Sequence, residues 1–394
     1  MIENVIDDRY KRESLLGEGN FGKVYLCKDL ESGKFAAVKL EQSSKDNQLE
    51  NEARVLQDLN NTYGFPKYYG SKFTKDYCYL AMELLGPSIN DKFVECRKRF
   101  SLKTVTKLAK SMLLRVKSLH ENGYIHRDLK PQQFLLGPQK DSDSVFLVDF
   151  GLSKRYKTKD LGIHVPYMEN RAFVGTTYYA SVNTHKGIQQ SRRDDLETLC
   201  YLFSYFLKGT LPWKNKTKEK ITETKIRSIK TNTSPIQLFS DSPREFFYLM
   251  SYVKNLQYDS SPDYNYMIHL LDFVSQQFNC DEVPFDWVGS KDFKKSSTKR
   301  SSSPKKPKRK RNKSCKPLCL EGNLSFQEQI KSISRFTNNS ALYDEHDQTV
   351  VASTLPEFKN REIIAFKIPR KLSKKVFRSY DIERPRDRHN CFIF

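Results

Sequence analysis

The fold is decided by residues 125–133, which read Ile-His-Arg-Asp-Leu-Lys-Pro-Gln-Gln. On its own, His-Arg-Asp would occur by chance in about one chain in twenty of this size. Three further motifs accompany it: Gly-Glu-Gly-Asn-Phe-Gly-Lys-Val at 17–24, Ala-Ala-Val-Lys at 36–39 and, after an apolar run, Asp-Phe-Gly at 149–151. Four motifs in this order and at these spacings leave almost no room for coincidence.

The four motifs resemble those of protein kinases, which transfer a phosphoryl group from ATP. In that family the glycines of the first motif let backbone N–H groups approach the phosphates. A Gly-x-Gly-x-x-Gly pattern also occurs in dinucleotide-binding folds, but there a helix follows it. Here residues 24–26 and 35–38 read as strands, which favours the kinase interpretation.

The kinase resemblance implies a role for each charged motif residue. Lys39 would contact the α- and β-phosphates, and Asp149 would bind the metal ion, expected to be Mg²⁺, that bridges the phosphates. Asp128 would accept the proton of the substrate hydroxyl, and Lys130 would stabilise the transferring phosphoryl group. A lysine two residues after the aspartate is typical of Ser/Thr kinases.

The ion-pair partner of Lys39 has two candidates, Glu50 and Glu52, on a helix predicted at 48–59. The apolar residues of this stretch recur at helical spacing. Glu52 lies closer to that apolar face than Glu50, so we expect Glu52 to hold Lys39 and Glu50 to be solvated.

Gln133 departs from the kinase pattern, which has an asparagine ligand of Mg²⁺ at this place. Glutamine supplies the same amide oxygen one methylene further out, while Mg²⁺ demands near-octahedral geometry at about 2.0–2.1 Å. We therefore predict that Gln133 lowers the activity without abolishing it. The alternative is a pseudokinase, or scaffold, that binds nucleotide or partners without efficient catalysis.

Within the kinases, the chain resembles the casein kinase I family over about residues 9–288. Most of this resemblance lies at 175–197, where Ser-Val-Asn at 181–183 replaces the Ala-Pro-Glu of most other kinases. Residues 83–88 (Glu-Leu-Leu-Gly-Pro-Ser) resemble that family's hinge. Leu-Pro-Trp and Pro-Asp-Tyr motifs then follow in the family's order.

The resemblance also implies where ATP binds. Met82 would be the gatekeeper, and the backbone of Glu83 and Leu85 would bind adenine. Asp195 would brace the catalytic loop. The residues implied for the nucleotide are Leu16, Gly17, Gly19, Gly22, Val24, Ala37, Lys39, Met82, Glu83, Leu85 and Leu135.

Tyr178 is a second departure, because the family has an arginine there that grips a phosphate already on the substrate. Lys154, Arg155 and the Lys-rich stretch 214–230 remain. We therefore expect protein substrates with a weak preference for acidic or phosphorylated sequences. Between 151 and 175, no Ser or Thr sits where its phosphorylation would clearly pair with the catalytic-loop arginine, so no activating phosphorylation is expected.

The resemblance and the element pattern predict an α+β, bilobal fold that acts as a monomer. The kinase domain would span residues 1–288, with a strand-rich N-lobe at about 1–85 and a helical C-lobe at about 86–288. Residues 101–120 are predicted as an amphipathic helix capped by its first serine, and residues 194–206 as a buried helix.

Residues 289–394 are predicted to be a basic, largely disordered tail. Residues 291–394 carry 26 basic and 11 acidic side chains, and 13 of these basic residues lie in 291–316. Such a segment repels itself and has too little apolar surface to fold. Thr298 and Ser301 to Ser303 are candidate sites for inhibitory phosphorylation, although the segment is equally read as a solvated linker.

Two tail motifs predict different locations. Residues 304–311 resemble a nuclear import signal, although a generic polyanion-binding linker looks the same. Residues 391–394 (Cys-Phe-Ile-Phe) fit a prenylation box whose terminal Phe points to geranylgeranyl. One prenyl chain anchors weakly, so the basic run would add attraction to an anionic membrane. We favour a cytoplasmic protein anchored to membrane through Cys391, with the nucleus as the alternative.

Composition excludes several other classes. No apolar run reaches the about 18 residues of a membrane span, and the N-terminal residues lack the plan of a signal peptide. The eight cysteines show no paired spacing, which predicts free thiols. Cys315 and Cys319 lack a second ligand pair for a metal site. No specific nucleic-acid partner is expected.

Overall fold

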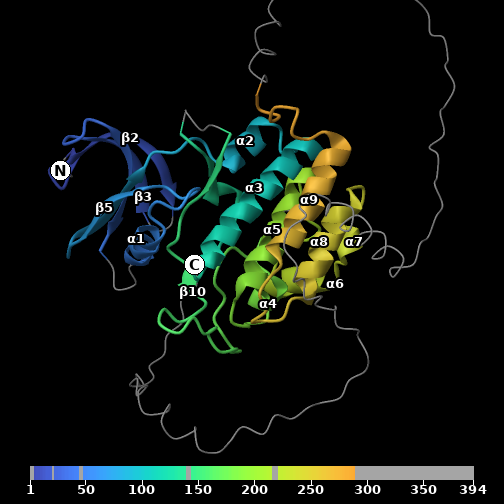
Figure 1. Cartoon of the computed structure of the whole chain (residues 1–394). Helices are drawn as coiled ribbons and strands as arrows, with labels where there is room; N and C mark the ends of the chain where they lie inside the picture. The colour runs from blue at the N-terminus through green and yellow to red at the C-terminus, as the bar shows by residue number, and fades with distance from the viewer. Residues whose placement is uncertain (1–3, 20–21, 44–47, 139–142, 215–220, 289–394) are drawn as a thin grey trace, which may run out of the picture. The chain divides into compact units, whose positions relative to one another are not determined.

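The computed structural model describes residues 4–19, 22–43, 48–138, 143–214 and 221–288. All of them belong to one compact unit, Met1–Ser303. The N-terminal part of this unit is strand-rich and the C-terminal part is helical (Figure 1), as a bilobal fold requires. The predictions made for residues 289–394, which include disorder, phosphorylation, prenylation and nuclear import, lie outside the described residues.

The N-lobe is an antiparallel sheet in the order β1-β2-β3-β4-β6-β5. A helix, α1 (Gln48–Asp58), packs on the sheet through β5 and β6. The strands are β1 (Val5–Ile6), β2 (Tyr10–Gly19), β3 (Gly22–Asp29), β4 (Phe35–Gln42), β5 (Tyr68–Phe73) and β6 (Tyr77–Glu83). The strands predicted at 24–26 and 35–38 are confirmed as β3 and β4, and the helix predicted at 48–59 is confirmed as α1.

Four longer helices build the C-lobe, and each packs against at least one of the others (Figure 1). They are α3 (Leu102–Glu121), α5 (Arg192–Lys208), α8 (Arg244–Asn255) and α9 (Tyr264–Phe278). The shorter helices are α2 (Ile89–Glu95), α4 (Val182–His185), α6 (Glu223–Asn232) and α7 (Pro235–Leu238). The short strands and turn around the catalytic loop are β7 (Tyr124–Ile125), η1 (Pro131–Gln133), β8 (Phe134–Leu136), β9 (Val145–Leu147) and β10 (Lys154–Arg155).

Local sequence explains where the two central helices begin. The hydroxyl of Ser101 accepts a hydrogen bond from the backbone N–H of Thr104, so Ser101 caps α3 as predicted. The helix predicted at 194–206 begins two residues earlier, because Ser191 and Asp194 form a capping box. Most residues of α5 are buried, so this helix forms the centre of the C-lobe.

The state of the described cysteines agrees with the prediction of free thiols. The described cysteines are free thiols. None of the helices in this part of the chain is long and apolar enough to cross a membrane.

Candidate functional site

The glycine-rich motif forms the hairpin between β2 and β3, whose pairing extends to Gly19 and Gly22. A Cβ at Gly22 would lie 2.5 Å from the carbonyl oxygen of Leu40 on β4, so strand packing excludes any side chain there. A Cβ at Gly17 would meet no atom within 4 Å. Gly22 is therefore needed for the sheet itself, while Gly17 faces open space.

Lys39 joins the two lobes through two carboxylates. Its Nζ lies 2.7 Å from Oε2 of Glu52 on α1 and 3.4 Å from Oδ1 of Asp149. Glu52 is buried, whereas Glu50 is exposed and makes no contact with Lys39, so the geometry favours Glu52 of the two candidates. Burial opposes the charge of Lys39, but Glu52 and Asp149 outweigh it and raise the pKa of Lys39 above its usual value.

Asp128 is held from both sides. The Nζ of Lys130 donates to Oδ2 of Asp128 at 2.7 Å, and the hydroxyl of Thr176 donates to Oδ1 at 2.6 Å. These contacts orient the carboxylate, because both partners donate hydrogen bonds to it. The contact with Thr176 also joins the catalytic loop to the segment 175–185.

Asp195 on α5 fixes the backbone of the catalytic loop. Its Oδ2 accepts the N–H of His126 at 2.7 Å, and its Oδ1 accepts the N–H of Arg127 at 3.0 Å. Arg127 adopts a φ of 71°, which residues other than glycine rarely do. Burial would raise the pKa of Asp195, but the hydrogen bond from His120 and the neighbouring histidine charges hold it below its usual value.

Gln133 lies against Asp149, as a shared metal site requires, but its amide nitrogen rather than its amide oxygen faces the carboxylate. Its Nε2 donates to Oδ2 of Asp149 at 2.5 Å. Burial would raise the pKa of Asp149, but the charge of Lys39 and other nearby cations holds it below its usual value. The amide oxygen of Gln133 would face a metal ion once the amide turns over.

The donor set fits Mg²⁺ only together with phosphate oxygens. Among the described residues, no group of three or more His, Cys, Asp or Glu side chains could hold a metal ion. Mg²⁺ is usually bound by one or two carboxylates together with substrate phosphates, so no larger protein cluster is needed. Asp149 and Gln133 would hold the ion, which would neutralise charge on the phosphates.

The residues implied for adenine come from strands of both lobes, with Val24 on β3, Ala37 on β4, Met82 on β6 and Leu135 on β8. Ala37 on β4 and Met82 on β6 are register partners and are both buried. Val24 and Leu135 are half-buried, and Leu16 is exposed.

The hinge refines one expectation about adenine. The N–H of Glu83 donates to the carbonyl of Lys67 at 2.9 Å, so this N–H is not free for a ligand. No backbone hydrogen bond among the described residues takes the N–H of Leu85.

Comparison with known families agrees with this geometry. The model of the protein kinase domain matches residues 10–274. The chain belongs to the protein kinase family. Its members bind ATP, use divalent metal ions and act on protein substrates. These properties account for the carboxylates of Asp128 and Asp149, for Lys39 and for the glycine-rich hairpin.

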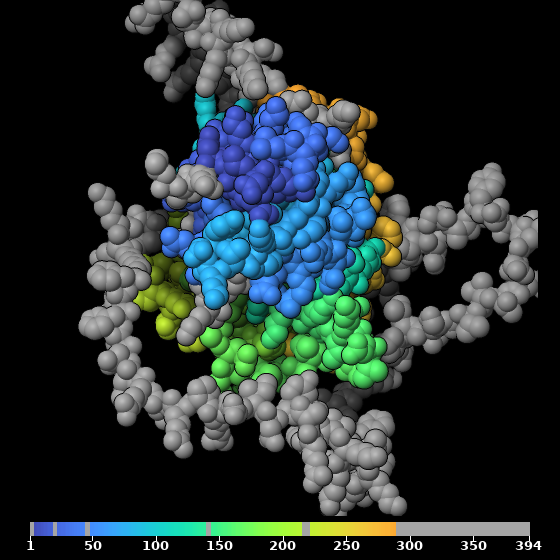
Figure 2. All heavy atoms as spheres, turned by 90° about the vertical axis from the view of Figure 1, so that its left-hand side faces the viewer, coloured from blue at the N-terminus to red at the C-terminus, as the bar shows by residue number. Residues whose placement is uncertain are grey.

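Asn51 makes a structural link to residues 150–153 that the sequence did not indicate. Its Nδ2 donates to three backbone carbonyls, those of Phe150, Gly151 and Ser153, at 2.9–3.1 Å. Viewed from the sheet side, the green segment that these residues begin lies directly below the N-lobe (Figure 2). Asn51 stands next to Glu52 on α1, so one helix holds both Lys39 and the start of residues 151–175, the activation segment of a kinase.

Three cations gather beside the catalytic loop: Arg127, Lys154 and Arg171. Burial and then the like charges of Arg127 and Arg171 lower the pKa of Lys154. Among the described residues, none of the three forms an ion pair with a carboxylate. The cluster is therefore electropositive, and a bound acidic group would reduce the repulsion between its three cations.

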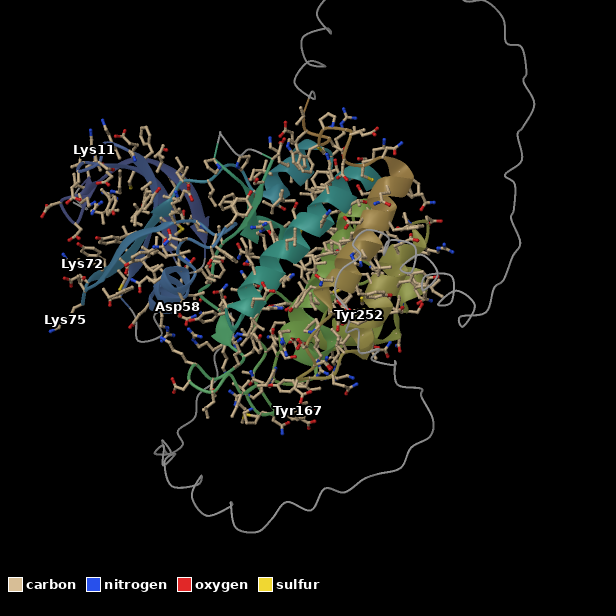
Figure 3. All side chains as sticks on the ribbon, viewed as in Figure 1. Lys11, Asp58, Lys72, Lys75, Tyr167 and Tyr252 are labelled. Carbon is tan, nitrogen blue, oxygen red and sulfur yellow. The ribbon has the colours of Figure 1, made fainter. Side chains whose placement is uncertain are left out.

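Arg155 is not part of this cluster, contrary to expectation. Its guanidinium forms an ion pair with Asp58 and lies 4.3 Å from the ring centroid of Tyr124. Asp58 stands at the end of α1 that points toward the C-lobe (Figure 3). Arg155 therefore links the two lobes and is not available for a substrate.

Tyr178 has a packing role in place of an anion-binding one. Its hydroxyl accepts the N–H of Leu211 at 3.1 Å, and its ring packs edge-on against Tyr179, Tyr205 and Trp213. The side chain is thus fixed among aromatic rings of the C-lobe. Tyr178 therefore supplies no positive charge that could bind a phosphate at this position.

Proposed function

We propose that this protein is a Ser/Thr protein kinase of casein kinase I type, which uses Mg²⁺ and transfers the γ-phosphoryl group of ATP to Ser and Thr side chains of proteins. The proposal rests above all on Asp128, whose carboxylate is aimed by Lys130 and Thr176. A base must lie within hydrogen-bond reach of the hydroxyl proton it accepts. The lysine beside it supplies positive charge where the phosphoryl group passes.

The remaining residues would position the nucleotide. Lys39, held by Glu52, would neutralise the α- and β-phosphates, while the open space at Gly17 would let the hairpin backbone approach them. Phe150 is buried and its N–H donates to Oε1 of Glu52 at 3.3 Å, so Asp149 is presented to the phosphates from a fixed backbone. This arrangement is the one that catalysis needs.

The cluster of Arg127, Lys154 and Arg171 supports a preference for acidic or already phosphorylated substrates. Guanidinium groups match carboxylate and phosphate oxygens bidentately. Tyr178 contributes nothing to this grip, so the preference should be weak. The chain is proposed to act as a monomer.

Radiolabelled ATP, Mg²⁺ and casein, incubated with the full chain, test the proposal. The Asp128→Asn variant keeps the shape of the side chain and removes the base, so it is the matched control. We expect phosphoserine and phosphothreonine in casein with wild type and a rate at least about a hundredfold lower with the variant. ATP binding without any transfer, equal for both proteins, would identify a pseudokinase.

For the tail we propose attachment to a membrane surface through a prenylated Cys391, assisted by the basic residues 304–311. The composition supports this proposal, since one lipid chain needs a second signal for stable binding. Import into the nucleus through the same basic run is the competing location.

A further inference from the structure

Lys230 on α6 is buried at 1% exposure, and the catalytic mechanism does not use it. Lysine is almost never fully buried unless its ammonium is paired. Burial lowers the pKa of Lys230 to about 7, so the charged form is held here at a cost. A lysine that is costly to bury calls for a specific role.

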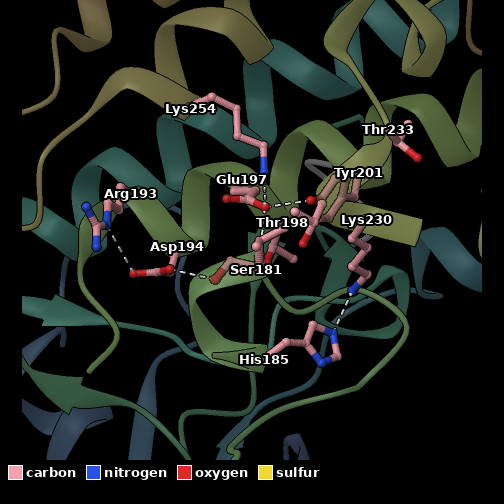
Figure 4. A network of polar contacts seen from close by, with 12 residues as sticks. Ser181, His185, Arg193, Asp194, Glu197, Thr198, Tyr201, Lys230, Thr233 and Lys254 are labelled. Carbon is pink, nitrogen blue, oxygen red and sulfur yellow. Dashed lines mark hydrogen bonds and ion pairs between the residues drawn. The ribbon is translucent and has the colours of Figure 1, made fainter. Parts of the chain in front are cut away.

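The Nζ of Lys230 lies within hydrogen-bond distance of two backbone carbonyls and of one histidine nitrogen. Its Nζ lies 2.9 Å from the carbonyl oxygen of Thr177, 2.6 Å from that of Ala180 and 3.1 Å from Nε2 of His185. Figure 4 shows Lys230 reaching toward His185 from α6. The two carbonyls belong to the turn that follows Thr176.

The state of His185 is consistent with this arrangement. Its Nδ1 lies 3.2 Å from a carboxylate oxygen of Glu223, and its Nε2 lies 3.2 Å from the carbonyl oxygen of Thr177 as well as 3.1 Å from Nζ of Lys230. Burial and the charge of Lys230 lower the pKa of His185. Lys230 and His185 therefore converge on the same carbonyl, that of Thr177.

No carboxylate touches the ammonium of Lys230 in the part of the chain that the structure describes. The rings of Tyr201 and Trp213 lie beneath it, with centroids 5.3 and 5.0 Å from Nζ. Glu197, the nearest buried carboxylate, is paired with Lys254 at 2.7 Å (Figure 4). The charge is thus stabilised by carbonyl dipoles and aromatic faces, which ties it to one position of the turn.

That turn adjoins the catalytic base. Thr176 donates to Asp128, and both Tyr179 and Ala180 donate their N–H groups to the carbonyl of Thr176 at 2.9 Å. Gly175 has a φ of 114°, and a Cβ there would lie 2.5 Å from the carbonyl oxygen of Arg127. The turn therefore packs directly on the catalytic loop, with Lys230 on its opposite side.

We propose that Lys230 is a positioning residue for the protein substrate. By holding the carbonyls of Thr177 and Ala180, it fixes the turn 176–180 against Asp128, where a substrate chain must lie to present its hydroxyl. The proposal rests on the kinase activity proposed above. It makes no demand on ATP binding, because Lys230 contacts none of the residues implied for the nucleotide.

Lys230→Met tests the proposal, since methionine keeps the apolar stem and removes the ammonium. Lys225→Met is the matched control, because Lys225 is exposed on the same helix. With the full chain, we expect Lys230→Met to lower kcat/KM for a peptide substrate by about ten- to a hundredfold, mainly through KM, while the Kd for ATP changes less than about twofold. Lys230→Gln keeps an N–H donor on a shorter side chain, so its kcat/KM for the peptide should lie between those of wild type and Lys230→Met.

Hydrogen exchange supplies a readout that does not need activity. In Lys230→Met, amides of residues 176–185 should exchange faster than in Lys225→Met, while those of α3 should not change. If wild type proves inactive, this exchange result still tests the role of Lys230 separately from the proposed function. An unchanged peptide KM with unchanged exchange, or an equal loss of ATP and peptide binding, would overturn the proposal.

Discussion

Replacing Gln133 by asparagine tests the metal site. The side chain is 4% exposed and its Nε2 lies 2.5 Å from Oδ2 of Asp149. Two neighbouring oxygen ligands of an octahedral Mg²⁺ lie about 2.9 Å apart, because each stands about 2.05 Å from the ion. Gln133 must therefore withdraw by about 0.4 Å, turn its oxygen to the ion and give up its hydrogen bond to Asp149.

The lost hydrogen bond sets the expected size of the effect. A hydrogen bond to a charged group contributes about 1.5–3 kcal/mol, which corresponds to about ten- to a hundredfold in rate or affinity. Asparagine is shorter by one C–C bond of about 1.5 Å, so its amide stands back from Asp149 and does not compete with the ion. Gln133→Asn should therefore raise kcat at limiting Mg²⁺ by about ten- to a hundredfold and lower the Mg²⁺ concentration needed for half the maximal rate.

Gln132→Asn is the matched control, because it makes the same chemical change on the neighbouring, exposed residue. Initial rates of casein phosphorylation, measured across a Mg²⁺ titration at saturating ATP, separate metal affinity from turnover. If Gln133→Asn and Gln132→Asn give the same Mg²⁺ curve as wild type, Gln133 is a tolerated ligand and the argument from its reach is wrong.

Three further changes have expected outcomes. Asn51→Ala removes the donor to three backbone carbonyls and should lower the free energy of unfolding by about 1–3 kcal/mol in urea titrations, with faster hydrogen exchange at the start of the activation segment. Tyr178→Arg should lower the melting temperature, because it breaks the contact with Leu211. It should raise the ratio of kcat/KM between phosphorylated and unphosphorylated peptides, because it supplies a guanidinium group that binds phosphate; an unchanged ratio would contradict the role given to this position. Cys391→Ser should move the protein from membrane to soluble fractions on cell fractionation, since only the electrostatic attraction remains; identical fractionation of wild type and variant would count against prenylation.

Local patterns made most of the fold predictable. Ser101 caps α3 because its hydroxyl meets an N–H three residues on, a relation contained within one turn of sequence. The motif residues Lys39 and Asp149 come together although 110 positions separate them, because strand β4 and the loop after β9 carry them to one place. Helix starts were less predictable: the capping box of Ser191 extends α5 beyond its apolar pattern.

Contacts to backbone carbonyls from distant side chains could not be predicted in this way. Asn51 reads as a polar helix residue, yet its partners lie about a hundred positions away in the chain. Lys230 reads as the end of a lysine-rich, solvated stretch, yet it is buried under residues 177–180. Arg155 reads as an anion-binding residue, yet Asp58 neutralises it. In each case the partner is set by tertiary packing, which composition and periodicity do not encode.

Two of these unexpected residues, Asn51 and Lys230, contact one segment, that from Phe150 to Ala180. Asn51 holds its beginning through carbonyl groups, and Lys230 holds its end in the same way. Arg127 adds a hydrogen bond from Nε to the carbonyl of Leu152 at 2.6 Å. A segment fixed at both ends by side-chain donors is consistent with the expectation that no activating phosphorylation is needed opposite Arg127. We therefore expect the charge of Arg127 to be available to an anionic group of the substrate.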